Sequence, residues 1–84
     1  MNSVVVIEDD QSLREMLSSI LSANGYEVVA FADGETAVAD QHTTEAGLAI
    51  IDIGLPGMDG LDVCRRLRLH GRTAPVMMLT ARHD

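Results

Sequence analysis

Four short runs of apolar residues recur along the chain. They cover residues 4–7, 28–31, 48–51 and 76–79, and in each run apolar side chains follow one another without intervening polar positions. A continuous apolar run of this length is typical of a strand in a parallel sheet, because both faces of such a strand are covered. The pattern therefore predicts four buried parallel strands.

Helical signals occupy the segments between these runs. Ser12 and Glu15 fit a capping box at the start of the first helix, and Gly25 fits its C-terminal stop. The second segment predicts a weaker helix from Asp33 to near His42. One face of the first helix has apolar residues at helical spacing, namely Leu13, Met16, Leu17, Ile20 and Leu21.

The third segment predicts a helix that begins at Asp59 or Gly60 and is stopped by Gly71. The buried stripe of this helix is expected to contain Leu61, Cys64 and Leu67. The arginines in and after it are expected to form a solvated face, which consists of Arg65, Arg66, Arg68 and Arg72.

The elements alternate in the order β-α-β-α-β-α-β, and each crossover is long enough for a right-handed parallel connection. This order predicts an α/β fold with a doubly wound parallel sheet. With 84 residues the chain is one domain at most. No internal repeat, linker or second zone of composition interrupts it.

Acidic residues stand where two of the predicted strands end. Glu8, Asp9 and Asp10 follow the first strand, Asp52 ends the third, and Thr80 ends the fourth. Open α/β sheets bind their ligands at the carboxyl ends of their strands. With Glu8, Asp9 and Asp52 within about 5 Å, each ionised pair repels by roughly 3 kcal/mol at an effective dielectric constant near 20. The cluster must therefore bind a cation or hold a proton, and a set of hard oxygen ligands suits Mg²⁺.

Each of these residues also has a simpler interpretation. Glu8, Asp9 and Asp10 could merely complement the positive N-terminus of the first helix. Asp52 could start a turn, and the hydroxyl of Thr80 could be satisfied by nearby backbone. The helix interpretation cannot account for Asp52, which comes from another strand, and Thr80 ends its strand beside the same edge. The combination favours a binding site.

Composition narrows the class of protein. The net charge of −7 argues against nucleic acid or an anionic membrane as a direct partner of this segment. One cysteine excludes an internal disulfide and fits a reducing compartment. No apolar run is long enough for a transmembrane helix or a signal peptide, so a cytoplasmic chain is expected. All six basic residues are arginines, and there is no lysine.

In its motifs the chain resembles the receiver domains of bacterial two-component response regulators. These motifs are the acidic residues after the first strand, the aspartate that ends the third, the loop Leu-Pro-Gly-Met-Asp-Gly over residues 55–60, and Leu-Thr-Ala-Arg over residues 79–82. The resemblance covers the whole chain and implies a flavodoxin-like sheet. It implies that Asp52 is the phosphoacceptor and that Thr80 hydrogen-bonds the attached phosphoryl group. It also implies that Asp9 and Asp52 bind Mg²⁺ directly, Glu8 through water and Gly54 through its carbonyl oxygen, with Asp10 as a helix cap.

The implied function is a phosphoacceptor switch that takes a phosphoryl group from a sensor histidine kinase. The chain would catalyse its own phosphorylation and dephosphorylation without being a metabolic enzyme. A DNA-binding output domain is implied by analogy, because the ending over residues 79–82 resembles receivers attached to such domains.

The chain departs from this family in what it lacks. Receivers carry a lysine at the end of a fifth strand, whereas here the fourth helix, the fifth strand, the fifth helix and any lysine are absent. Residues 1–84 are therefore expected to be the N-terminal part of a receiver domain. Loss of the fifth strand would leave the fourth as an exposed edge, and self-association through this edge is expected.

Three other functions remain open at this point. A flavin-binding domain of the same fold would need a phosphate-binding loop where this chain has Glu8, Asp9 and Asp10. A magnesium-dependent phosphatase with an aspartyl nucleophile would want a second aspartate two residues after Asp52, where this chain has Gly54. A receiver-like interaction module that is not phosphorylated would fit the absence of lysine.

Overall fold

Four strands and four helices make up the part of the chain that the structure, a computed structural model, describes, namely residues 2–79. In chain order they are β1 (Ser3–Ile7), α1 (Gln11–Ala23), β2 (Glu27–Phe31), α2 (Gly34–Val38), α3 (Gln41–Glu45), β3 (Leu48–Asp52), α4 (Gly60–Leu69) and β4 (Val76–Leu79). All four predicted strands are confirmed to within one residue at each end. Among residues 2–79, no helix is both long enough and apolar enough to cross a membrane.

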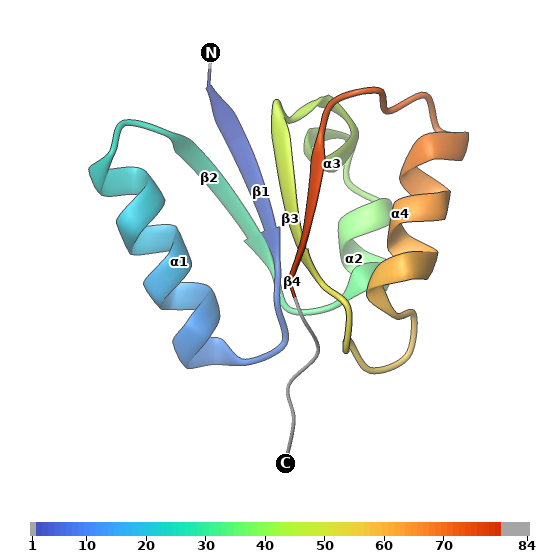
Figure 1. The fold of residues 1–84 in the computed structure, drawn as a ribbon, viewed down its shortest axis with the longest axis horizontal. Coiled ribbons are helices and arrows are strands. Elements are labelled where there is room, and N and C mark those ends of the chain that lie inside the picture. Colours follow the sequence, from blue (N-terminus) through green and yellow to red (C-terminus); the bar gives the residue numbers. More distant parts are fainter. Residues whose placement is uncertain (1, 80–84) are drawn as a thin grey trace.

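The strands form one parallel sheet in the order β2-β1-β3-β4 (Figure 1). β1 therefore lies between β2 and β3, and the register pairs Ile7 with Phe31 on one side and with Ile51 on the other. The strand order reverses between β1 and β3. From β1 the chain crosses to β2 on one side, and it then crosses back to β3 on the other side of β1. In such sheets, the crevice at the carboxyl ends of the two central strands is the usual ligand site.

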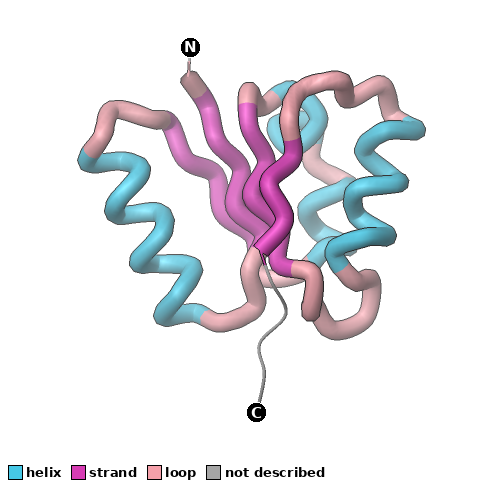
Figure 2. The backbone as a smooth tube through the Cα atoms, viewed as in Figure 1, coloured by secondary structure: helices cyan, strands magenta, loops and turns pink. Residues whose placement is uncertain are grey.

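Helices cover both faces of the sheet, as a doubly wound fold requires (Figure 2). On one face, Val4, Val6 and Ile50 are buried together with the partly buried side chains of Leu17 and Leu21 from α1. On the other face, the core joins alternate residues of β1 and β3 to α2 and α4 through Val5, Ile7, Ala37, Ala49, Ile51, Val63 and Leu67. The predicted doubly wound α/β fold is confirmed.

The start of α1 differs from the prediction. Asp10 is the N-cap, and its Oδ1 accepts a hydrogen bond from the backbone N–H of Leu13 at 3.1 Å. Ser12 therefore lies inside the first turn, and the capping box with Glu15 is wrong. The predicted stop at Gly25 is confirmed, because this residue follows the C-cap with a φ of 90°, a conformation that glycine adopts without strain.

The segment predicted as one helix to near His42 contains two. α2 ends at Val38, and the side chain of Asp40 then accepts a hydrogen bond from the backbone N–H of His42 and begins α3. Asp33 caps α2 as predicted. The apolar pattern does not reveal the break, because Asp40 fits either an exposed position in one helix or the cap of a second, and its extended backbone decides for the cap.

The buried face of α4 is rotated from the predicted stripe. Gly60, Val63 and Leu67 are its buried residues, whereas Leu61 is 49% exposed and Cys64 is only half-buried. Asp59 caps the helix and Gly71, with a φ of 92°, follows it, as predicted. The prediction that Cys64 is a core residue is therefore wrong. Val63, one position earlier, takes that place against β3.

Arg72 is buried rather than solvated, which is a second correction to this region. Its guanidinium group, with the residue 2% exposed, donates to the carbonyl oxygens of Thr43 at 2.9 Å, Ala46 at 2.8 Å and Pro75 at 2.8 Å. The group thereby joins the end of α3 to the start of β4, and burial lowers its pKa.

Candidate metal and phosphoacceptor site

Two neighbouring strands deliver the acidic residues to one edge of the sheet. β1 ends at Ile7, so Glu8 and Asp9 lie in the turn that leads to α1. Asp52 is the last residue of β3, the strand paired with β1 through Ile7 and Ile51. Because both strands are parallel, their carboxyl ends meet at the same edge, as predicted.

One carboxylate oxygen from each of Glu8, Asp9 and Asp52 lies within 4.8 Å of the others. Glu8 is 1% exposed and Asp52 is 2% exposed, while Asp9 is half-buried. Buried carboxylates are rare unless they are paired, hydrogen-bonded or bound to a metal. Two buried carboxylates and one half-buried carboxylate at this spacing concentrate negative charge at the carboxyl edge of the sheet.

Backbone N–H groups orient two of these carboxylates. Asp10 donates to Oε2 of Glu8 at 3.0 Å, and Gly54 donates to Oδ1 of Asp52 at 3.1 Å. Asp10 itself serves as the cap of α1, so it contributes to the site through its main chain, and its predicted role as a cap is confirmed.

The donor set suits Mg²⁺. It consists of carboxylate oxygens only, with no sulfur or imidazole ligand, and Mg²⁺ takes one or two carboxylates while keeping several waters. Asp9 is only half-buried, so solvent reaches the cluster at the sheet edge. The water ligands of a bound Mg²⁺ would lie on this side. The residues present therefore fit a hard divalent cation.

Close contacts fix the loop that follows Asp52. Oε2 of Glu35 accepts a hydrogen bond from the backbone N–H of Met58 at 3.1 Å, so α2 holds the loop from the side. Gly57, with a φ of 71°, lies against the same carboxylate. At Gly60, a Cβ atom would lie 2.4 Å from the carbonyl oxygen of Asp52. Glycine lets the first turn of α4 approach the end of β3 this closely.

The structure brings together three of the predicted site residues, Glu8, Asp9 and Asp52. Gly54 lies beside them through its N–H bond to Asp52, and the role of its carbonyl oxygen stays a prediction. Thr80 lies outside the described residues. Sequence reasoning missed Arg14 and Glu35, which hold the two loops of the site. A basic residue four positions after the cap Asp10 and an acid in the first turn of α2 were the available signals.

Comparisons with known proteins agree with this geometry. The chain is 40% identical over 82 residues to the sensory transduction protein RegX3 of Mycolicibacterium smegmatis, which covers 98% of this chain and 36% of that protein. It is 40% identical over 81 residues to the DNA-binding response regulator MtrA of the same organism, covering 96% of this chain and 35% of MtrA. The chain thus spans about a third of the length of these relatives.

A solved structure has the same arrangement. The response regulator protein TrrA of Thermotoga maritima, crystallised in complex with Mg²⁺ and a beryllium fluoride, matches with a TM-score of 0.86 and 33% identity. The match covers 98% of this chain and 71% of that one. The family model of the response regulator receiver domain matches residues 4–84, so the chain belongs to the response regulator receiver domain family.

Proposed function

We propose that this chain is a phosphoacceptor of two-component signalling, with Asp52 as the nucleophile and Mg²⁺ bound by Asp9, Asp52, Glu8 through water and the carbonyl oxygen of Gly54. The observation that carries the proposal is the cluster of three carboxylates within 4.8 Å at the sheet edge. Membership of the receiver family supports it. The name of the relative MtrA, a DNA-binding response regulator, supports it as well.

In the proposed reaction, a carboxylate oxygen of Asp52 attacks the phosphorus of a phosphohistidine on the kinase. A P–O bond to Asp52 forms and the P–N bond breaks, so the imidazole leaves with the electron pair. Bound Mg²⁺ offsets the charge on the transferring oxygens. Gly54 holds Oδ1 of Asp52, which fixes the orientation of the nucleophile, and burial of Asp52 limits access of water to it.

The same site would hydrolyse the acyl phosphate, so the chain catalyses its own modification and its reversal. Thr80 is proposed to contact the phosphoryl group and to transmit the switch. We also propose that residues 1–84 are the N-terminal part of a receiver domain, that its donor is a sensor histidine kinase, and that a DNA-binding output domain accompanies it. The name of MtrA as a DNA-binding response regulator supports this last point.

The nucleophile can be tested with a small phosphodonor, which needs no knowledge of the kinase. Incubation with acetyl phosphate and Mg²⁺ is expected to add one phosphoryl group, which mass spectrometry after borohydride reduction of the acyl phosphate maps to Asp52. Asp52→Asn removes the nucleophile and Asp9→Ala removes a metal ligand, so both variants are expected to stay unmodified.

Asp62→Asn is the matched control. Asp62 is a partly exposed acid of α4 that pairs with Arg65 at 2.9 Å and does not belong to the carboxylate cluster, so this variant is expected to be phosphorylated like the wild type. Phosphate on another residue would contradict the assignment of Asp52. Absence of phosphate together with retained Mg²⁺ binding would favour an interaction module, and release of free phosphate from many organic phosphomonoesters would favour a phosphatase.

A further inference from the structure

Arg14 connects α1 to the two residues that the proposed metal site takes from the β1–α1 turn. Its Nη1 donates to the carbonyl oxygen of Glu8 at 2.9 Å and reaches that of Asp9 at 3.5 Å. Both hydrogen bonds run to the main chain, not to carboxylate oxygens. The first turn of α1 brings this basic side chain back to the residues that precede the helix.

The two carbonyl groups belong to the peptide planes on either side of Asp9. Because each peptide group is planar, the orientations of these two planes set φ and ψ of Asp9 and hence the direction of its Cα–Cβ bond. A side chain that holds both carbonyl groups therefore aims the Asp9 carboxylate through the main chain.

Asp9 is the least buried of the three acids. Glu8 and Asp52 are almost fully buried, and each accepts a hydrogen bond from a backbone N–H group. Asp9 is half-buried in the turn between β1 and α1. Repulsion between ionised carboxylates within 4.8 Å of one another favours movement of Asp9 toward solvent. A held main chain opposes this movement.

We infer that Arg14 is a positioning residue of the metal site, which aims Asp9 through the two flanking peptide groups. The inference rests on the proposed Mg²⁺ site. The inference is testable because the charge of Arg14 and its positioning contacts predict opposite changes in Mg²⁺ affinity when the side chain is removed. Loss of a cation beside an Mg²⁺ site strengthens binding if charge alone matters, whereas loss of a positioning group weakens it.

The experiment is a calorimetric titration of Mg²⁺ into the 84-residue chain and its variants. In Arg14→Gln the Kd is expected to rise about tenfold, the lower end of the range for groups that orient metal ligands. Arg14→Lys keeps the charge and N–H donors, but its compact ammonium group on a flexible stem does not reproduce the planar guanidinium geometry that reaches both carbonyl groups, so its Kd is expected to lie between those of the wild type and Arg14→Gln. The backbone amide signals of residues 8–10 are expected to shift in both variants before Mg²⁺ is added.

Arg68→Gln is the matched control. Arg68 also donates from Nη1 to two carbonyl oxygens, those of Arg72 at 3.3 Å and Ala74 at 3.1 Å, but it does so in the α4–β4 loop at the opposite edge of the sheet. This variant loses the same charge and the same kind of contact, and its Kd for Mg²⁺ is expected to equal that of the wild type.

The outcomes separate this inference from the proposed function. If the wild type binds no Mg²⁺, the proposed metal site fails. If the wild type binds and Arg14→Gln binds equally or more tightly, the positioning role is overturned. Should Arg14→Gln not fold, Arg14→Lys decides alone, because a Kd equal to that of the wild type contradicts positioning and a weaker one supports it.

Discussion

At the scale of single residues, aspartate has two different roles in this chain. Asp10, Asp33, Asp40 and Asp59 each cap one of the four helices within residues 2–79, with a side-chain oxygen that accepts a backbone N–H. Asp9 and Asp52 instead gather at the sheet edge. Part of the acidic composition therefore has a structural origin, and the candidate site consists of Glu8, Asp9 and Asp52.

Two of the caps are expected to contribute to acid denaturation. Hydrogen bonds from the N–H of Thr36 and of His42 lower the pKa of Asp33 and of Asp40 from the ordinary value of 3.8. A carboxyl whose pKa is lower in the folded state stabilises the fold above its unfolded value and loses that contribution as pH falls through the folded value. The double variant Asp33→Asn/Asp40→Asn keeps the caps without the charge, since asparagine also caps helices. Its stability is expected to fall less steeply below pH 3.8 than that of the wild type.

Urea unfolding at a series of acidic pH values measures this slope. Glu27→Gln, which changes an exposed acid on β2 that caps no helix, is the control and is expected to keep the slope of the wild type. A double variant with an unchanged slope would show that the two caps are not responsible for it.

The sequence predicted the carboxylates of the site because their positions follow from strand ends alone. A continuous apolar run that stops at Asp52, and another that stops before Glu8, place these residues at one edge in any parallel sheet. The contacts of Arg14 and Glu35 could not be predicted in this way, since they depend on how a long side chain folds back onto the main chain.

At the scale of elements, the strands were predictable and the helix boundaries were predictable only in part. Strand positions follow from apolar runs, whereas caps compete along the chain: Asp10 precedes Ser12, and Asp40 divides the segment before β3. The rotation of α4 has a further cause. Gly60 lies against the carbonyl group of Asp52, so contact with β3 turns Val63 into the core and Cys64 toward its edge.

The close approach of Gly60 predicts a specific effect of adding one methyl group. In Gly60→Ala the new Cβ would lie 2.4 Å from the carbonyl oxygen of Asp52 and 2.8 Å from Cα of Ile53, so α4 must move away from β3. Overpacking of this kind costs about 1–3 kcal/mol. The variant is expected to lose stability by this amount and to be phosphorylated more slowly by acetyl phosphate, because the displaced backbone carries Asp52.

Gly47→Ala is the matched control, because its Cβ would meet the carbonyl oxygen of Ser3 at 3.5 Å, an ordinary contact, at the other edge of the sheet. Urea unfolding and the initial rate of phosphorylation give both quantities. Equal behaviour of the two alanine variants would contradict the role assigned to Gly60.

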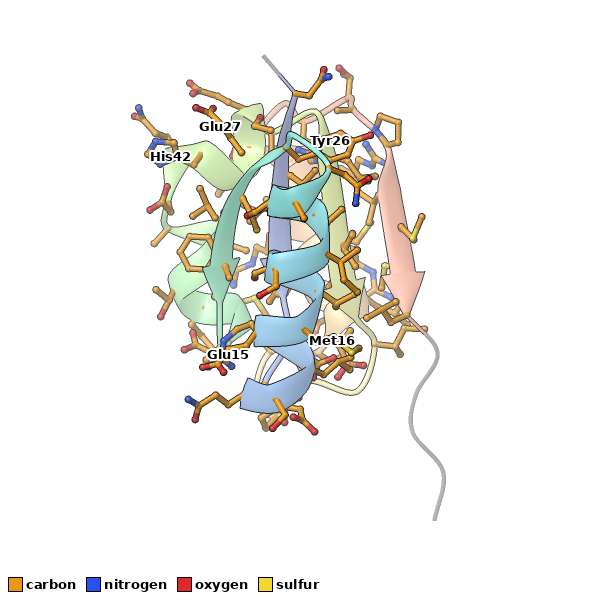
Figure 3. The ribbon with its side chains drawn as sticks, turned by 90° about the vertical axis from the view of Figure 1, so that its left-hand side faces the viewer. Glu15, Met16, Tyr26, Glu27 and His42 are labelled. Carbon is orange, nitrogen blue, oxygen red and sulfur yellow. The ribbon has the colours of Figure 1, made fainter. Side chains whose placement is uncertain are left out.

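At the scale of the whole molecule, the sheet is covered unevenly. α1 lies over the β2 and β1 side of one face, and Met16 projects from it on the side where β4 lies (Figure 3). Met16 and Ile20 are 51% and 53% exposed, and Met77 on β4 is 51% exposed. β4 pairs only with β3 among the described strands. α1 and β4 thus each carry exposed apolar side chains, and one side of β4 has no partner among the described strands.

This arrangement predicts that the 84-residue chain, produced alone, self-associates through β4. An exposed apolar edge strand pairs readily with another chain, and burial of a side chain such as methionine contributes about 1.5–3 kcal/mol. Met77→Lys places a charge on this strand and is expected to shift the chain toward the monomer of 9.0 kDa. Leu69→Lys is the control. It replaces another exposed apolar side chain, which is 81% exposed on α4 rather than on β4, and it is expected to leave the association unchanged. Sedimentation velocity distinguishes these states, and a wild-type monomer of 9.0 kDa with a cooperative unfolding transition would contradict the prediction.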